Sequence, residues 1–328
     1  MLKDSHLAKW RYIVRKLVYS IAVFALAALH CLQSAGAVKD EPASQSAAGP
    51  PTIVFMTDYG VQEDSVAVCK GVMWSIAPTA RIVDVTHQEP AHDPAHISPQ
   101  SIEKGARLLF ATSPYYPAGT VFLAAINPHV GASRKRVVVK SKRGQYFVLP
   151  DNGLITLVQD RDGIEGTREI SNASWMMGYA LSSTFEGRDI FSPVAAHLAR
   201  GDDWVQVGPE VKDLVRIKIS AARLDGSGIK GEAIALWEPY GNVVTNISGD
   251  DFRKLDYNFG QNVPVMLANA KEELRVPFVR AFSEVGANKE LLFIDSRGGH
   301  LVLAINEGNF ARTYGVTPGQ PILVAGKK

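Results

Sequence analysis

Side chains able to act as acids or bases, or to hold a ligand, follow apolar runs at several places in this 328-residue chain. The clearest case is Asp58, which comes directly after the largely apolar run 53–57 and precedes Tyr59 and Gly60. A short apolar run is typical of a buried strand in a parallel sheet, and ligands bind beyond the carboxyl ends of such strands. A carboxylate at that position serves as an acid, as a base, or as an acceptor for ligand hydroxyl groups.

Further clusters have the same placement after apolar segments. Taken singly, each has an ordinary structural explanation, because a carboxylate after a strand often caps a helix and Asn-Pro or Ser-Arg-Gly often forms a turn. Their recurrence at strand ends favours a shared ligand site. The clusters are Glu63 to Ser65, Asn127 to Gly131 with Arg134, Thr184 to Asp189, Tyr240 to Asn246, and Ser296 to Gly298.

The first half of the mature chain must position most of these residues. Strand-like and helix-like segments alternate from residue 52 to about 209, which is typical of a sheet with helices on its faces. We therefore predict an α/β N-terminal domain with a mostly parallel sheet over residues 52–215. The predicted strands are 53–57, 81–85, 121–126, 136–140 and 146–149, the last two forming a hairpin, and the predicted helices are 64–76 and 101–111.

The sequence pattern changes beyond Gly208, where helix-like segments become scarce. Short β-type runs separated by glycine, asparagine or proline predict a smaller all-β C-terminal domain, a barrel or a sandwich, over residues 225–328. The segment 212–227 reads as the linker between the two domains. The predicted strands of this second domain are 229–237, 243–247, 264–267, 291–295, 300–305 and 321–324.

The N-terminus has the layout of a secretory signal peptide. A basic lead precedes the apolar stretch 17–29, and Ala35-Gly36-Ala37 offers a cleavage site, so we assign residues 1–37 to the signal. The apolar stretch is short for a stable membrane span, although a retained N-terminal anchor is the alternative. Residues 38–51 are polar and proline-bearing and predict a disordered tether. We expect an exported protein, in a bacterial periplasm or secreted.

The composition excludes some classes of function. The 35 basic and 33 acidic residues nearly balance, so nothing in the net charge favours a nucleic acid or membrane partner. Removal of the signal peptide leaves only Cys69, which excludes an internal disulfide.

Taken in order, the motifs resemble those of the S-adenosylmethionine-cleaving enzymes, a family that includes the hydroxide adenosyltransferases (SAM hydrolases), the fluorinase and the chlorinase. The resemblance implies displacement at the ribose C5′ of S-adenosylmethionine with release of methionine, without a cofactor. It also implies a homotrimer with the substrate held between neighbouring subunits. It is carried by FMTDYG (55–60), IVDVTH (82–87), YYPAGTVFLAAINPHVG (115–131), LPDNGLI (149–155), TFEGRDIFSPVAAHLA (184–199), YGNVVTNI (240–247) and SRG (296–298).

The resemblance also implies which residues grip the substrate. Asp58 would accept both ribose hydroxyls, and Asn242 would read the adenine edge, with Tyr240 stacking near the base. Ser296 and Arg297 would hold the methionine carboxylate, because the arginine fork matches that group. Glu63 and Ser65 fall where the family grips the amino acid portion. Each residue also has a structural alternative: a helix cap for Asp58, a turn residue for Asn242, an aromatic core residue for Tyr240 and a solvated hairpin arginine for Arg297.

The sequence departs from the family pattern where the nucleophile would lie. Hydroxide adenosyltransferases carry Asp, Arg and His at the positions that are Asn127, Arg134 and Glu186 here. We hypothesise that Glu186, paired with Arg134, orients or deprotonates the attacking water, with Asn127 as a hydrogen-bond partner. His129, two residues from Asn127, is the alternative source of the imidazole that the family's histidine would supply. A chloride adenosyltransferase, which Gly187 matches, and a binding protein without catalysis are the competing hypotheses.

Two other features favour ordinary explanations. The residues His87, His92, Asp93 and His96 lack the compact spacing of a metal motif, so we expect no metal. The basic residues from Arg134 to Arg143 are typical of a solvated hairpin rather than a nucleic-acid surface.

Overall fold

The computed structural model describes residues 49–87, 99–126, 134–178, 184–270, 272–297 and 299–327. The signal peptide predicted for residues 1–37 and most of the predicted tether lie outside these ranges. No helix among the described residues is long and apolar enough to cross a membrane.

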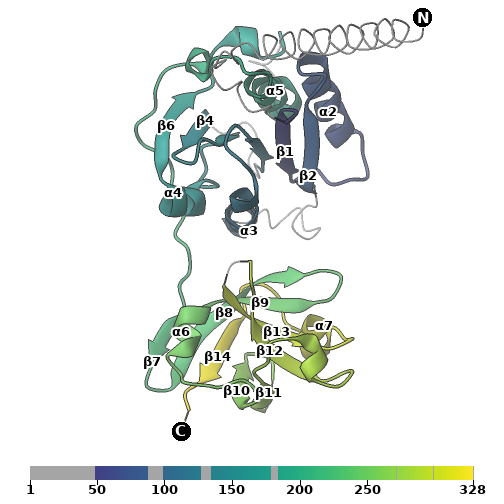
Figure 1. Cartoon of the computed structure of the whole chain (residues 1–328), viewed down its shortest axis with the longest axis vertical. Helices are drawn as coiled ribbons and strands as arrows, with labels where there is room; N and C mark the ends of the chain where they lie inside the picture. The colour runs from purple at the N-terminus through teal and green to yellow at the C-terminus, as the bar shows by residue number, and fades with distance from the viewer. Residues whose placement is uncertain are drawn as a thin grey trace, which may run out of the picture. The chain divides into compact units, whose positions relative to one another are not determined.

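Six strands form the first sheet, in the spatial order β2-β1-β3-β5-β4-β6 (Figure 1). Strand β1 runs parallel to β2 and β3, and β3 runs parallel to β5, whereas β4 is antiparallel to both of its neighbours. The carboxyl ends of β1, β2 and β3 therefore meet at one edge of the sheet. The strands are β1 (Thr52–Thr57), β2 (Arg81–Thr86), β3 (Val121–Ala125), β4 (Arg136–Ser141), β5 (Tyr146–Pro150) and β6 (Ile164–Glu169).

Helices cover both faces of this sheet. Because side chains alternate along a strand, Phe55 of β1 packs with Met73 and Val194 on one face, while Val54 packs with Leu109 and Val158 on the other. All six side chains are buried, and each such burial stabilises the fold by about 1.5–3 kcal/mol. The first face carries α2 (Ser65–Ile76) and α5 (Ser192–Arg200), and the second carries α3 (Pro99–Thr112) and α4 (Thr156–Asp162).

The second domain is an antiparallel sheet that curls into a nearly closed barrel. Its strand order is β11-β10-β14-β8-β9-β13-β12, with β7 paired to β8, and a bridge between Phe278 and Leu292 brings the two ends of this path together. The sheet encloses a large apolar core, and Val279, Leu291 and Ala304 form a smaller separate cluster. The elements are β7 (Arg223–Asp225), β8 (Gly228–Trp237), β9 (Asn242–Ser248), α6 (Gly249–Arg253), β10 (Asn262–Leu267), β11 (Leu274–Pro277), β12 (Glu290–Ile294), β13 (His300–Ile305), α7 (Phe310–Tyr314) and β14 (Pro321–Ala325).

The predicted fold class is confirmed, and the structure selects the barrel over the sandwich. Every predicted strand and both predicted helices are present, with boundaries that differ by a few residues. The sequence analysis did not predict β6, β7, β11 or the helices α4 to α7. Residues 211–222 contain no helix or strand, whereas β7 falls inside the predicted linker 212–227.

Candidate active site

The loops after β1 and β2 are joined by hydrogen bonds at the edge of the sheet that carries Asp58. The hydroxyl oxygen of Thr57 lies 2.9 Å from Nδ1 of His87, and the backbone N–H of Gly60 donates to the carbonyl of His87 at 2.6 Å. His87 is buried, and its Nε2 lies 3.1 Å from Oδ1 of Asp84. These contacts fix the turn in which Asp58 stands.

His87 thus has a structural role in this turn. The described residues contain no group of three His, Cys, Asp or Glu side chains that could hold a metal ion. His92, Asp93 and His96 lie outside the described residues.

Glu186 begins a π-helix over Gly187–Phe191 and is largely buried. π-Helices are rare in proteins, and those that do occur often lie at functional sites. The Nε and Nη2 atoms of Arg136, the first residue of β4, both donate to Oε1 of Glu186, at 2.9 and 2.5 Å. A buried carboxylate therefore stands at this edge of the sheet with its charge paired to a guanidinium.

The arginine in this salt bridge corrects one part of the sequence hypothesis. The hypothesis paired Glu186 with Arg134, whereas the structure gives Arg136 as the counter-ion. Arg134 is partly buried and has an interaction of its own. Asn127 and His129 lie outside the described residues, so their predicted roles stay predictions.

Tyr59 connects Asp58 to Glu186. Its ring meets Phe185 edge-on, with 5.4 Å between centroids, and a Cβ atom added to Gly187 would lie only 1.9 Å from the Tyr59 hydroxyl. Burial raises the pKa of the Tyr59 phenol well above its usual range, and Cys69 and the charges of Asp58 and Glu186 raise it further. The Tyr59 phenol therefore stays neutral.

The remaining candidates of the first domain lie at the start of α2. Glu63 is exposed, and Ser65, the first residue of the helix, is partly buried. Asp64, which lies between them, occupies the N-cap position of α2 without a side-chain cap hydrogen bond. Their predicted contact with the amino acid portion of a ligand stays a prediction.

Three of the four candidate residues of the second domain line one pocket, and Ser296 is not among its lining residues. Tyr240, Asn242 and Arg297 line a pocket of about 860 Å³, and Trp237 and Phe282 add aromatic walls. Asn242 is only 6% exposed, and its Oδ1 atom accepts no hydrogen bond from the described residues. A buried amide oxygen without a donor is costly, so a ligand donor at this point would stabilise the pocket.

A residue that the sequence analysis did not single out shapes this pocket. Asp295 is 5% exposed and accepts the backbone N–H groups of Arg297 at 2.7 Å and of His300 at 2.8 Å. Both carboxylate oxygens thereby hold the turn that presents Ser296 and Arg297. The Arg297 guanidinium lies 5.0 Å from the centre of the Trp237 ring, a cation–π distance. In the sequence, the signal that could have identified Asp295 is its position directly before the Ser-Arg-Gly motif.

Comparison with known proteins covers both domains. The family model described as the SAM hydroxide adenosyltransferase N-terminal domain matches residues 53–208, and the model of the corresponding C-terminal domain matches residues 233–323. The chain belongs to the SAM hydroxide adenosyltransferase family. The predicted resemblance is confirmed.

Relatives with two different names resemble this SAM hydroxide adenosyltransferase family member. The (R)-S-adenosyl-L-methionine hydrolase of Salinispora tropica is 35% identical over 84% of this chain and 97% of its own length. A fluorinase of Actinoplanes is 30% identical over 84% of this chain and 98% of its length. A solved structure of an uncharacterized conserved protein from Thermotoga maritima aligns with a TM-score of 0.74 and 35% identity, covering 83% of this chain and 99% of that one.

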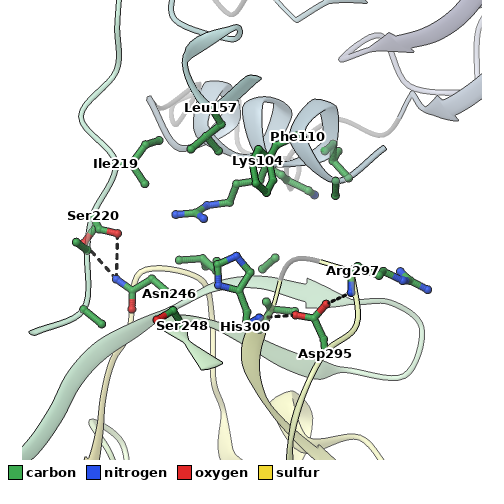
Figure 2. Close-up of a pocket in the computed structure, with 18 of the residues that line it drawn as sticks. Lys104, Phe110, Leu157, Ile219, Ser220, Asn246, Ser248, Asp295, Arg297 and His300 are labelled. Atoms are coloured by element: carbon green, nitrogen blue, oxygen red, sulfur yellow. Dashed lines mark hydrogen bonds between the residues drawn. The ribbon is translucent and has the colours of Figure 1, made fainter. Parts of the chain in front are cut away.

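A second hollow of this family member, of about 520 Å³, has a different lining (Figure 2). Figure 2 shows Lys104 and Phe110 of α3 with Ile219 and Ser220, and Asn246 donates to both oxygens of Ser220. Among the described residues, only Arg297 of the predicted site lines this hollow. We therefore place one half of the candidate active site at the carboxyl ends of the first-sheet strands, near Asp58 and Glu186. The other half is the Asn242 pocket, the 860 Å³ hollow that Tyr240, Asn242 and Arg297 line.

Proposed function

We propose that this protein hydrolyses S-adenosylmethionine to adenosine and L-methionine, by attack of water or hydroxide at the ribose C5′ carbon. Its relatives named (R)-S-adenosyl-L-methionine hydrolase support this reaction. The observation that carries the proposal is the buried Glu186 carboxylate, paired with Arg136 beside Gly187, the glycine against which the Tyr59 ring lies. This arrangement suits a site that activates water.

The reaction asks little acid catalysis of the protein, because a sulfonium is already a good leaving group. The site must align water opposite the sulfur and remove competing solvent, which calls for residues that grip the substrate. In the proposal Asp58 accepts the two ribose hydroxyls, and Asn242 pairs with the adenine edge, whose amine would satisfy its buried Oδ1 atom. Neither step requires a metal or cofactor.

The water itself would be handled by Glu186. A carboxylate is the ordinary general base of such a site, and it needs to lie within hydrogen-bond reach of the water it deprotonates. Arg134 and Asn127 complete the proposed set, as orienting partners from the segment after β3. Arg297 and Ser296 would hold the methionine carboxylate, with Tyr240 near the base and Glu63 and Ser65 near the amino acid portion.

The fluorinase relatives make halide transfer the second candidate function. Gly187 favours it, because it gives the small residue expected of a chlorinase. The Glu186 charge weighs against it, since two like charges about 4 Å apart repel by about 4 kcal/mol at an effective dielectric of about 20. Water carries no such penalty. A SAM-binding protein without catalysis is the third candidate.

Incubation of the purified protein with S-adenosylmethionine, with and without chloride, separates these candidates. We expect adenosine and methionine in both conditions, identified by chromatography and mass spectrometry. Formation of 5′-chloroadenosine would establish the second candidate, and binding without turnover the third.

We also propose that the active protein is an exported homotrimer. The Asn242 pocket is lined by residues of the second domain alone, and the Glu186 and Asp58 cluster by residues of the first. A site assembled from neighbouring subunits would join the two sets of residues. Mass measurement in solution tests the trimer, and N-terminal sequencing of the protein recovered from its native host tests cleavage after residue 37.

Asp295→Asn tests the second-domain half of the site. The amide keeps the shape of Asp295 but places an NH₂ group against one of the two backbone N–H donors, so the turn carrying Arg297 loses a hydrogen bond worth about 1–3 kcal/mol. We expect the Kd for S-adenosylmethionine, measured by calorimetry, to rise roughly tenfold or more. The matched control is Asp250→Asn, whose side chain is 90% exposed, and which should leave the Kd unchanged. An unchanged Kd in Asp295→Asn would remove Asp295 from this role.

A further inference from the structure

The salt bridge between Arg136 and Glu186 has an asymmetry that bears on catalysis. Both donating nitrogens of Arg136 reach the same oxygen, Oε1, at 2.9 and 2.5 Å. Oε2 accepts no hydrogen bond from the described residues. The guanidinium therefore holds the carboxylate by one oxygen and leaves the other for a further partner.

The sheet holds Arg136 in a fixed place. Arg136 is the first residue of β4, paired in register with Pro150 of β5, and its carbonyl accepts the backbone N–H of Ile170 at 2.7 Å. Strand β4 lies between β5 and β6. A side chain anchored on a strand with neighbours on both sides positions its partner more precisely than one on a free loop.

The two side chains differ in exposure. The Glu186 side chain is 9% exposed and that of Arg136 is 35% exposed. The carboxylate is thus turned into the protein, and the guanidinium reaches it from the side nearer to solvent. Because the carboxylate is largely buried, loss of the guanidinium would leave its charge without a partner.

We propose that Arg136 is a positioning residue for the reaction: it holds Glu186 by Oε1 so that Oε2 faces the attacking water. This inference rests on the proposed hydrolase function. Arg136 itself touches neither water nor substrate. Its planar fork fixes the rotation of the carboxylate, whereas a lysine supplies a charge without that fork.

Steady-state kinetics with S-adenosylmethionine on the full-length protein tests the proposal. We expect Arg136→Gln to lower kcat by about 10- to 100-fold while the KM changes by less than about twofold, because a misplaced catalytic group affects the chemical step. Arg136→Lys should recover part of the loss. The control, Lys135→Gln, removes a neighbouring side chain that is 51% exposed and 3.8 Å from Glu169, and it should keep the wild-type kcat.

A double-mutant cycle distinguishes positioning from a merely structural role. If Arg136 acts through Glu186, Arg136→Gln should change the residual single-turnover rate of Glu186→Gln by less than about twofold. An equal loss in both backgrounds, or a lowered Tm with unchanged kcat, overturns the inference. If Arg136→Gln does not fold, the same cycle is run with Arg136→Lys.

The failure of this inference is distinguishable from failure of the proposed function. Absence of adenosine from the wild-type protein overturns the hydrolase function, and this inference with it. Adenosine formation by the wild type, with full kcat in Arg136→Gln, overturns the role of Arg136 alone.

Discussion

Glu186→Gln should reduce the kcat for adenosine formation by about 10²- to 10⁴-fold, which is the usual contribution of a general base. Glutamine keeps the length and shape of the side chain, and its Oε1 atom can still accept the hydrogen bonds of Arg136. The amide cannot take a proton from water. The substitution therefore removes basicity while keeping most of the geometry.

Substrate affinity separates this expectation from a general loss of structure. The residues proposed to grip the substrate are unchanged in Glu186→Gln, so the Kd for S-adenosylmethionine should stay within about threefold of the wild-type value if the substitution removes only an interaction made in the transition state. The rate is measured by single-turnover formation of adenosine and the Kd by calorimetry. Unchanged turnover would show that Glu186 is not the base and would direct attention to Asn127 and His129.

Elements with a clear local pattern could be predicted from the sequence. The apolar runs of β1 and β3 and the turn between β4 and β5 are signals that any tertiary context would preserve. Helix α5 was not predicted, although Pro193 at its start is a helix-start signal and six of its nine residues are buried. Strand β6 was missed because only Thr167 in it is buried, so it has no apolar run or clear alternation.

The candidate site could be predicted as a set of residues, but not as a set of contacts. Motif order placed Asp58 and Asn242 at strand ends, and they lie there, whereas Glu186 stands at the N-cap of a π-helix. The partner of Glu186 lies 50 residues away in the chain, so spacing alone could not decide between Arg134 and Arg136. That choice depends on where the fold places Glu186 relative to the first residue of β4, which is a tertiary effect.

The contacts of Asp295 in the second domain could not be predicted from the sequence either. Its role depends on two backbone N–H groups that fold back onto one carboxylate, and no motif spacing encodes that geometry. Buried polar groups that hold a turn are recognised from their partners, and partners are known only once the chain is folded.

Gly187→Ala should impair the first-domain half of the site severely. A Cβ atom there would lie 1.9 Å from the hydroxyl oxygen of Tyr59 and 2.7 Å from its Cζ atom, so the ring must leave its place beside Asp58 and Glu186. Because Phe185 and the apolar core hold that ring, we expect overpacking to cost about 1–3 kcal/mol of unfolding free energy. Turnover should fall by about 10²-fold, since small displacements of catalytic groups are costly.

A matched glycine isolates the clash from helix propensity. Gly71 lies in α2 with no atom within 4 Å of an added Cβ, so Gly71→Ala should keep wild-type turnover and raise the unfolding free energy by up to about 1 kcal/mol. Alanine favours helices at both positions, which leaves the contact with Tyr59 as the difference between them. Full activity and unchanged stability in Gly187→Ala would contradict the placement of Tyr59 against Gly187.

Removal of the Tyr59 hydroxyl gives the most specific form of this prediction. In a Tyr59→Phe background the atom 1.9 Å away is gone while the ring carbon at 2.7 Å stays, so Gly187→Ala should cost less stability there, but still more than Gly71→Ala. Thermal unfolding of Gly187→Ala, Tyr59→Phe, the double variant and Gly71→Ala measures the coupling free energy between positions 59 and 187. The same contact bears on the choice of nucleophile, because a serine at position 187 would also carry the clashing Cβ. Gly187→Ser should therefore lower adenosine formation without producing halogenated nucleoside in the presence of fluoride or chloride.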